Sequence, residues 1–323
     1  MKEKVLVSVP KSIFDQYMSN SRDLLEREGF EIIQHQSDSL MSVEGIKAIG
    51  SDIVGAVIGC EEWSREVFEA CPRLQVLARL GIGVDHIDLE AAKAHSVKVV
   101  NAKGMNSATV AEMTILLALS ASRNFVRLDR STRDGKWVHN FGTSLYDKVY
   151  GLVGFGNIAQ HVAKMLQGFQ LKKIIAFDLY PNYEAAQRLG VEFVDLHTLL
   201  QQSDIVSLHI PSTAQTHHLI NAETLKEMKK SAILINVARG AIVDEKALHR
   251  ALENKEIRAA GVDVYEQEPP EKSNPLFSLE NIDFSPHQAA DTLETLDSIS
   301  LYAASVVVDV VKHQKIPENW VNP

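Results

Sequence analysis

The sequence predicts an α/β protein with two domains, each a doubly wound parallel sheet with helices on both faces. Three observations support this prediction. Short apolar runs alternate with stretches of helical periodicity, as they do in parallel sheets. A long, almost entirely apolar helical pattern near residue 110 interrupts the alternation, which then begins again. The chain of 323 residues also exceeds the size at which a single hydrophobic core usually stops growing.

The first series of strands is predicted at residues 5–9, 31–35, 53–58, 75–80 and 97–100, with helical stretches between them. Residues 106–109 then open the long helix, whose residues 110–119 are apolar nearly all round. Because a helix that is apolar on every side is a buried helix, we expect it to lie between domains or subunits.

The second series begins at residue 149 and continues with strands near Ile174, Ile205, Ile233, Ala259 and Ile282, ahead of a closing apolar helix at 291–313. Its first strand leads into a glycine turn in mid-chain. We therefore expect a nested layout, in which residues 101–288 form one domain inserted into a domain built from residues 1–100 and 289–323.

The glycine turn has the pattern that binds a dinucleotide. Gly154 suits a tight turn with positive φ, Gly156 lets the backbone approach a pyrophosphate, and the N–H groups near Asn157 and Ile158 face the phosphates at a helix start. Asp178 lies 22 residues after Gly156, where its carboxylate would accept the ribose hydroxyls and repel a 2′-phosphate, so NAD is favoured over NADP. The alternatives are a plain tight turn for the glycines and, for Asp178, a helix cap or a loop carboxylate.

Composition and charge limit the partners and the location. The formal net charge of −9 and the pI near 5.8 argue against nucleic acid or an anionic membrane as the main partner. No apolar run reaches the roughly 18 residues of a membrane span, and the N-terminal run is shorter than that of a signal peptide. The only cysteines are Cys60 and Cys71, which we interpret as small buried hydrophobic residues. We expect a soluble, cytoplasmic protein without disulfides.

Three segments of the second series carry candidate catalytic residues, each after a predicted strand. Arg239 has the fork-shaped guanidinium that binds a carboxylate and an adjacent carbonyl. His287 suits an acid or base because its ordinary pKa lies near neutrality. Glu268 would raise that pKa and keep the imidazole protonated, although Glu266 is an alternative partner. Ligands bind at the carboxyl ends of strands in open α/β sheets, where all of these lie.

Other histidines have simpler interpretations. His209 is predicted to be a packing residue close to the cofactor, and His217 and His218 lack the spacing of metal ligands. No H-E-x-x-H motif or Cys/His cluster occurs, so a metal centre is not expected.

Taken together, these motifs resemble the D-isomer-specific 2-hydroxyacid dehydrogenase family, particularly its phosphoglycerate-dehydrogenase-like branch. The resemblance covers nearly the whole chain. Besides the glycine turn, it is carried by LGIGVDHID at residues 80–88, VAE at 110–112, NVARG at 236–240, GVDVY at 261–265 with EP at 268–269, and SPH at 285–287.

The resemblance implies a flavodoxin-like, discontinuous substrate domain and an inserted Rossmann NAD-binding domain. It implies that Arg239, Glu268 and His287 are the catalytic residues. The remaining implied contacts are to the cofactor from Val237, Ala238 and Asp263, the last holding the nicotinamide amide, and to the substrate from Arg79, Arg239 and the N–H groups of Ile82 and Gly83. The family also implies a homodimer, held through the long helix and the arm that follows it.

The substrate expected from this resemblance is a small D-2-hydroxy acid or its 2-keto acid, D-3-phosphoglycerate among them. However, Glu61 and Glu62 follow the third predicted strand, where phosphoglycerate dehydrogenases often carry phosphate-binding arginines, and two acids would repel a phosphate. Reduction of glyoxylate or hydroxypyruvate is therefore an alternative. A different class, an NAD(H)-sensing interaction protein, is the other alternative.

Overall fold

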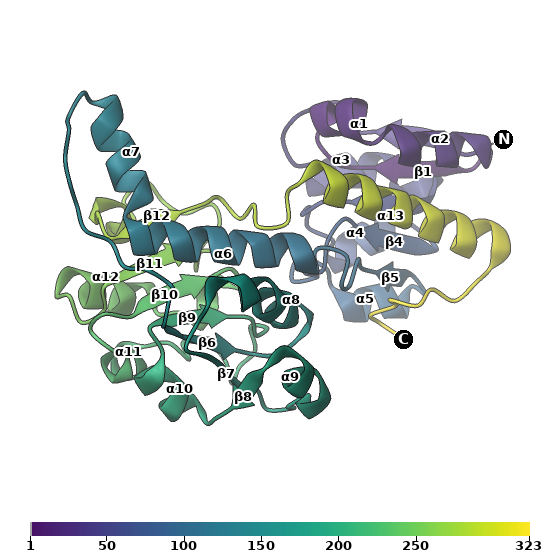
Figure 1. The fold of residues 1–323 in the computed structure, drawn as a ribbon. Helices are drawn as coiled ribbons and strands as arrows, with labels where there is room; N and C mark the ends of the chain where they lie inside the picture. Colours follow the sequence, from purple (N-terminus) through teal and green to yellow (C-terminus); the bar gives the residue numbers. More distant parts are fainter. Residues whose placement is uncertain (1) are drawn as a thin grey trace. The chain divides into compact units, whose positions relative to one another are not determined.

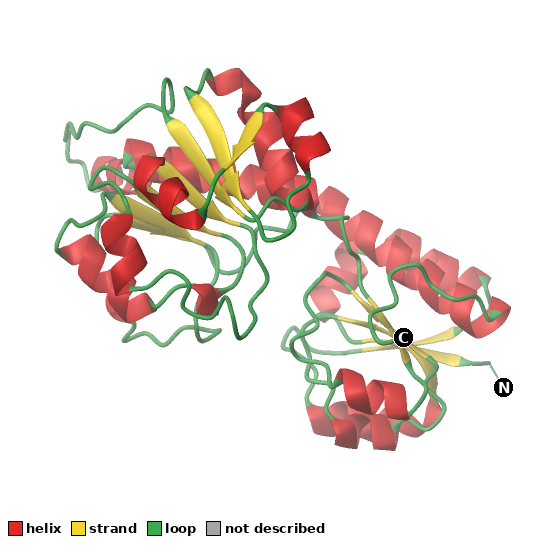
Figure 2. Ribbon diagram, turned by 90° about the horizontal axis from the view of Figure 1, so that it is seen from below, coloured by secondary structure: helices red, strands yellow, loops and turns green. Residues whose placement is uncertain are grey.

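The computed structural model describes residues 2–323, which fold into two compact units (Figure 1). One unit consists of Met1–Asn106 together with Asp291–Pro323, and the other of Ser107–Ala290. Each unit is an α/β layered structure with helices on both faces of its own sheet (Figure 2).

The first unit contains five parallel strands in the order β2-β1-β3-β4-β5. This is the flavodoxin-like strand order, as predicted. The strands are β1 (Lys4–Val7), β2 (Glu31–Gln34), β3 (Ile53–Ile58), β4 (Val76–Arg79) and β5 (Lys98–Val100). The helices are α1 (Lys11–Tyr17), α2 (Ser19–Arg27), α3 (Val43–Ile49), α4 (Arg65–Ala70), α5 (Leu89–Ala94) and α13 (Leu293–His313), with a 3-10 turn at Gly50–Asp52.

Helix α13 completes the core of the first unit. Its residues Ala303 and Val307 are buried in the same cluster as Val5, Val57 and Val76 of the sheet. The contact is close, since a Cβ on Gly55 of β3 would lie 2.9 Å from Cγ1 of Val307. Helix α13 therefore packs on strands formed by the first hundred residues.

The second unit contains seven parallel strands in the order β12-β11-β10-β9-β6-β7-β8. This is the Rossmann order with one further strand at one edge. The strands are β6 (Val149–Val153), β7 (Lys173–Phe177), β8 (Val191–Phe193), β9 (Ile205–Leu208), β10 (Ile233–Asn236), β11 (Ala259–Val262) and β12 (Ile282–Phe284). The helices are α6 (Ser107–Arg123), α7 (Phe125–Arg133), α8 (Asn157–Met165), α9 (Tyr183–Leu189), α10 (Leu196–Gln202), α11 (Ala222–Glu227) and α12 (Glu245–Glu253), with 3-10 turns at Leu166–Phe169, Gly240–Ile242 and Pro275–Ser278.

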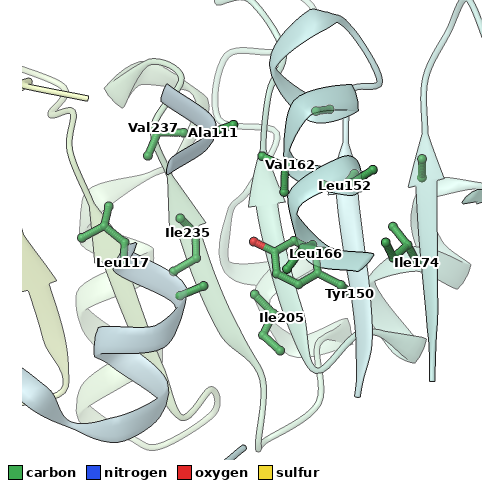
Figure 3. Packing of buried hydrophobic residues seen from close by; sticks show 14 of the residues in the cluster. Ala111, Leu117, Tyr150, Leu152, Val162, Leu166, Ile174, Ile205, Ile235 and Val237 are labelled. Atoms are coloured by element: carbon green, nitrogen blue, oxygen red, sulfur yellow. The ribbon is translucent and has the colours of Figure 1, made fainter. Parts of the chain in front are cut away.

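Helix α6 packs with one side on the sheet of its own unit. Its Leu117 is buried in a cluster with Tyr150 of β6, Ile235 of β10 and Val162 of α8 (Figure 3). Its Leu116, however, is 57% exposed. The buried positions of this helix form one stripe and leave an apolar side uncovered, and the expectation that it lies between domains or subunits stays a prediction.

The unit boundaries fall at 106/107 and 290/291, rather than at the predicted 100/101 and 288/289. The start of segment 101–106 is hydrogen-bonded to the first unit. The side chain of Asn101 donates to the Ile82 carbonyl at 2.8 Å, and the N–H of Ala102 donates to the Gly81 carbonyl at 2.8 Å. At the other end, Ala289 is buried in the core of the second unit.

Two further expectations need correction or addition. Cys60 is exposed, not buried, because it follows the end of β3, whereas Cys71 is buried; both are free thiols. The short edge strand β8 was not predicted from the sequence. Among residues 2–323, no helix combines the length and apolar character that crossing a membrane requires, and no cluster of three potential metal-ligating side chains occurs.

Candidate active site

The glycine turn leaves β6 at the point where the strand order of the second sheet reverses. Gly154 has φ 93°, and a Cβ there would lie 2.7 Å from the carbonyl oxygen of His209. Gly156 is the N-cap residue of α8, and no side chain caps this end of the helix. A Cβ added to Gly156 would have no heavy atom within 4 Å. The first N–H groups of α8, at Asn157 and Ile158, therefore face open space at the positive end of the helix, as a pyrophosphate site requires.

Asp178 joins the end of β7 to this turn. One carboxylate oxygen accepts the N–H of Phe155 at 2.7 Å and the other accepts the N–H of Tyr180 at 2.8 Å. Each carboxylate oxygen has more than one lone pair, so both keep the capacity to accept a ribose hydroxyl. These residues fit a dinucleotide whose adenosine ribose carries no 2′-phosphate.

His209 lies beside the turn at the end of β9. The residue is partly buried, Nε2 is 2.8 Å from Oγ of Ser207, and burial lowers the pKa of the imidazole to about 3. It is therefore neutral at physiological pH, which agrees with a packing role.

Arg239 stands on a turn that the side chain of Asn236 shapes. Asn236 is the last residue of β10 and is buried; its amide oxygen accepts the N–H of Ala238 at 3.1 Å and its amide nitrogen donates to the carbonyl of Arg239 at 3.0 Å. Val237 lies within the same turn. Sequence reasoning missed Asn236, although its place in the NVARG motif marks it.

Gly240 brings this turn against the loop that carries Glu268. A Cβ on Gly240 would lie 1.9 Å from both the carbonyl carbon and the carbonyl oxygen of Tyr265 and 2.4 Å from the backbone nitrogen of Glu266. Only glycine allows so close an approach of two backbones. The loop positions of Arg239 and Glu268 are therefore linked directly.

His287 and Glu268 form an ion pair, as predicted. Nδ1 of His287 lies 2.6 Å from Oε2 of Glu268, and Oε1 of Glu268 accepts the N–H of Tyr265 at 3.0 Å. Glu266, the alternative partner, pairs instead with His218, whose Nε2 is 3.0 Å from its Oε1. The pair engages Nδ1 of His287 and leaves its other ring nitrogen, Nε2, outside the contact with Glu268.

The electrostatics of this pair favour the charged forms. The hydrogen bond that His287 donates to Glu268 raises the pKa of His287 above its ordinary value, with smaller contributions from the charges of Glu268 and Asp263, while burial and Arg239 oppose the rise. Burial alone would raise the pKa of Glu268, but the hydrogen bonds from His287 and Tyr265 and the nearby positive charges outweigh it, and the pKa is lowered.

Asp263 holds the segment on which His287 stands. Its fully buried carboxylate accepts hydrogen bonds from Oγ of Ser285 at 2.5 Å and from the N–H groups of Gln288 and Ala289, both at 2.9 Å. Its carbonyl accepts the N–H of His287 at 2.7 Å. These bonds support the left-handed backbone of His287, φ 53°, which costs a non-glycine residue about 1–2 kcal/mol. The contact with a nicotinamide amide stays a prediction.

The predicted substrate residues of the first unit lie at the end of β4, which is Arg79, and in the loop that follows it. Arg79 donates from Nε to the Gly83 carbonyl at 3.2 Å, from Nη1 to the Leu80 carbonyl, and from Nη2 to Sγ of Cys60 at 3.2 Å. The N–H groups of Ile82 and Gly83 make no hydrogen bond to the rest of residues 2–323. Arg79 thus shapes the loop, and the two free N–H groups are the ones that can receive an anion.

Comparison with known proteins adds to this geometry. The family model described as the NAD-binding domain of D-isomer-specific 2-hydroxyacid dehydrogenases matches residues 115–289. The chain is 42% identical over 262 residues to a D-3-phosphoglycerate dehydrogenase of Methanocaldococcus jannaschii, covering 80% of this chain and 49% of that protein. It is 39% identical over 263 residues to a glyoxylate reductase of Korarchaeum cryptofilum, covering 80% and 79%.

Among solved structures, the apo-structure of D-lactate dehydrogenase from Escherichia coli superposes with a TM-score of 0.87 at 32% identity, covering 98% of this chain and 99% of that one. The chain spans about half the length of the phosphoglycerate dehydrogenase and nearly the whole length of the lactate dehydrogenase.

Proposed function

Since the chain belongs to the D-isomer-specific 2-hydroxyacid dehydrogenase family and contains its NAD-binding domain, we propose that it interconverts a small D-2-hydroxy acid and its 2-keto acid. The observation that carries this proposal is the His287–Glu268 pair, held at 2.6 Å on the same sheet edge as Arg239. A charged acid beside a guanidinium is what reduction of a 2-keto acid needs.

A bound nicotinamide supplies or accepts the hydride at C2 of the substrate, and this chain supplies the rest. Gly154, Gly156 and the start of α8 would hold the pyrophosphate, and Asp178 the ribose. Arg239 binds the substrate carboxylate and polarises the carbonyl. In reduction, Nε2 of His287 donates a proton to the carbonyl oxygen; in oxidation, the neutral imidazole accepts the hydroxyl proton. Glu268 stabilises the imidazolium throughout.

An unphosphorylated substrate, of the glyoxylate or hydroxypyruvate kind, is favoured over D-3-phosphoglycerate. Nε, Nη1 and Nη2 of Arg79 each donate to the following loop or to Cys60, so all three nitrogens of this guanidinium are engaged. Glu61 is buried, and burial raises its pKa and favours its neutral form, so of the two acids it is the exposed Glu62 that would repel a phosphate. Arg79 therefore supports the loop whose Ile82 and Gly83 N–H groups we assign to the substrate carboxylate.

The test is a panel of plain and phosphorylated 2-keto acids with NADH and NADPH. We expect NADH-dependent reduction of plain 2-keto acids, and a loss of roughly 10²–10⁴-fold in turnover for His287→Ala with NADH affinity retained. Native turnover in that variant would contradict the assignment. Tight NADH binding without turnover of any keto acid would favour the alternative, an NAD(H)-sensing interaction protein.

The proposal includes a homodimer and a cytoplasmic location. Apolar side chains on and after α6 and α7 are uncovered in a single chain: Leu116 and Phe125 on the helices, and Trp137 and Phe141, 86% and 91% exposed, on the arm that follows. A second copy would cover this surface, since exposed aromatic side chains are typical of interfaces. Light scattering should give twice the mass of 35.8 kDa.

The cytoplasmic location is supported by the two free cysteines, which suit a reducing compartment.

A further inference from the structure

The loop that carries Glu268 is fastened to the start of α12 by a reciprocal pair of hydrogen bonds. The backbone N–H of Glu266 donates to Oε1 of Glu245 at 2.8 Å, and the backbone N–H of Glu245 donates to Oε1 of Glu266 at 3.0 Å. We call these two residues and their mutual bonds the Glu245–Glu266 clasp. Each carboxylate satisfies the other residue's backbone, so losing either side chain opens one half of the clasp.

Two like charges meet in this clasp, and the surrounding groups offset their repulsion. Asn274 donates from Nδ2 to Oε2 of Glu245 at 2.8 Å, and His218 lies 3.0 Å from Oε1 of Glu266. Glu245 is also in the first turn of α12, where the helix dipole favours a negative charge. So many converging donors indicate that the position of this loop is specified closely.

The clasped segment contacts Glu268 itself and residues close in sequence to Arg239 and His287. The backbone of Tyr265 and Glu266 packs against Gly240, the residue after Arg239. The N–H of Tyr265 donates to Oε1 of Glu268 at 3.0 Å, and its hydroxyl donates to the carbonyl of Ser285 at 3.0 Å, two residues before His287. A shift of Glu266 would therefore move the groups that orient Glu268.

We propose that the Glu245–Glu266 clasp positions the carboxylate of Glu268 against Nδ1 of His287, which makes Glu245 and Glu266 positioning residues for proton transfer. The catalytic meaning of this inference rests on the proposed function, but the Glu268–His287 contact itself does not. The charged groups that face His287 are Glu268, Asp263 and Arg239. Of these, Glu268 is the one whose loop the clasp holds.

The experiment compares three variants. Glu266→Ala removes the acceptor for the Glu245 N–H, Glu266→Gln keeps an acceptor oxygen, and Glu271→Ala is the matched control, because Glu271 lies in the same loop and its side chain bonds Oγ of Ser273 only. The first readout needs no substrate: the His287 ring is titrated by NMR, its signal identified by its absence in His287→Gln.

In Glu266→Ala we expect His287 to titrate at lower pH than in the wild type, because its carboxylate partner is no longer held. In Glu266→Gln and Glu271→Ala the titration should stay close to that of the wild type. In the kinetic readout, kcat for keto-acid reduction should fall roughly 10–10²-fold in Glu266→Ala, with KM for NADH unchanged and with recovery in Glu266→Gln.

A folded Glu266→Ala protein in which His287 titrates as in the wild type would overturn the inference. So would a loss that Glu266→Gln does not rescue. If Glu266→Ala does not fold, Glu245→Ala removes the opposite half of the clasp and is held to the same titration outcome. Absence of keto-acid reduction in the wild type would refute the proposed function and leave the NMR result to decide the role of the clasp.

Discussion

The two glycines of the dinucleotide turn give a sharp test, because alanine at each position has a different physical effect. At Gly154 the backbone has φ 93° and a Cβ would lie 2.7 Å from the His209 carbonyl and 2.8 Å from Cγ2 of Ile210. At Gly156 the φ is −74°, which any residue adopts, and a Cβ would meet nothing within 4 Å. The space beside Gly156 is the space that we assign to the pyrophosphate.

For Gly154→Ala, the left-handed backbone costs about 1–2 kcal/mol and the steric overlap about 1–3 kcal/mol. The free energy of unfolding should therefore fall by about 2–5 kcal/mol. For a unit the size of Ser107–Ala290, this lowers Tm by roughly 4–20 °C. Gly156→Ala should change the free energy of unfolding by less than about 1 kcal/mol, because the backbone is compatible and only the preference of the helix-capping position changes.

NADH affinity should separate the two effects. In Gly156→Ala the new methyl group occupies the approach of the pyrophosphate, which costs about 1–3 kcal/mol and weakens binding about 5–150-fold. The assays are thermal unfolding without nucleotide and fluorescence titration with NADH. A Gly156→Ala protein that binds NADH as tightly as the wild type would refute the assignment of this turn to the pyrophosphate.

Three more predictions concern the acid–base pair, the choice of cofactor and the core. Reduction needs protonated His287, and Glu268 raises the pKa of His287, so kcat/KM should be full at low pH and fall as pH rises through this raised pKa. In Glu268→Gln the fall in kcat/KM should occur at lower pH. An unshifted pH profile in this variant would contradict the pairing. Asp178→Asn removes the charge that repels a 2′-phosphate, so the NADPH to NADH ratio of kcat/KM should rise roughly tenfold; an unchanged ratio would locate the preference elsewhere. Leu117→Ala should lower the free energy of unfolding by about 2–5 kcal/mol, measured by urea denaturation, as expected for a buried leucine.

Most strands could be predicted from the sequence because each is a short apolar run with a turn at its end, and the flavodoxin-like and Rossmann orders follow from the family. Edge strand β8 was missed because it has three residues, one of them the exposed Glu192. The exposure of Cys60 could not be inferred either, because a cysteine that follows an apolar run is expected to be as buried as the strand before it.

The pairing of His287 with Glu268 followed from residue types and was right, but the choice over Glu266 had only a weak basis in sequence. The structure explains the choice: Glu266 is occupied by His218 and by the N–H of Glu245, 21 residues away. Contacts at such separations depend on how loops from different strands meet. Local patterns in the sequence do not contain that information.

The packing of α13 on β3 and β4 has a consequence for synthesis. A ribosome has made every residue of Ser107–Ala290 before it makes α13, so the second unit can complete its core while the first sheet still lacks one helical layer. Domains generally fold as units as they emerge. The order of maturation is then the reverse of the order of translation for the leading strands: the core that contains Val57 and Val76 is completed only after α13 has left the exit tunnel.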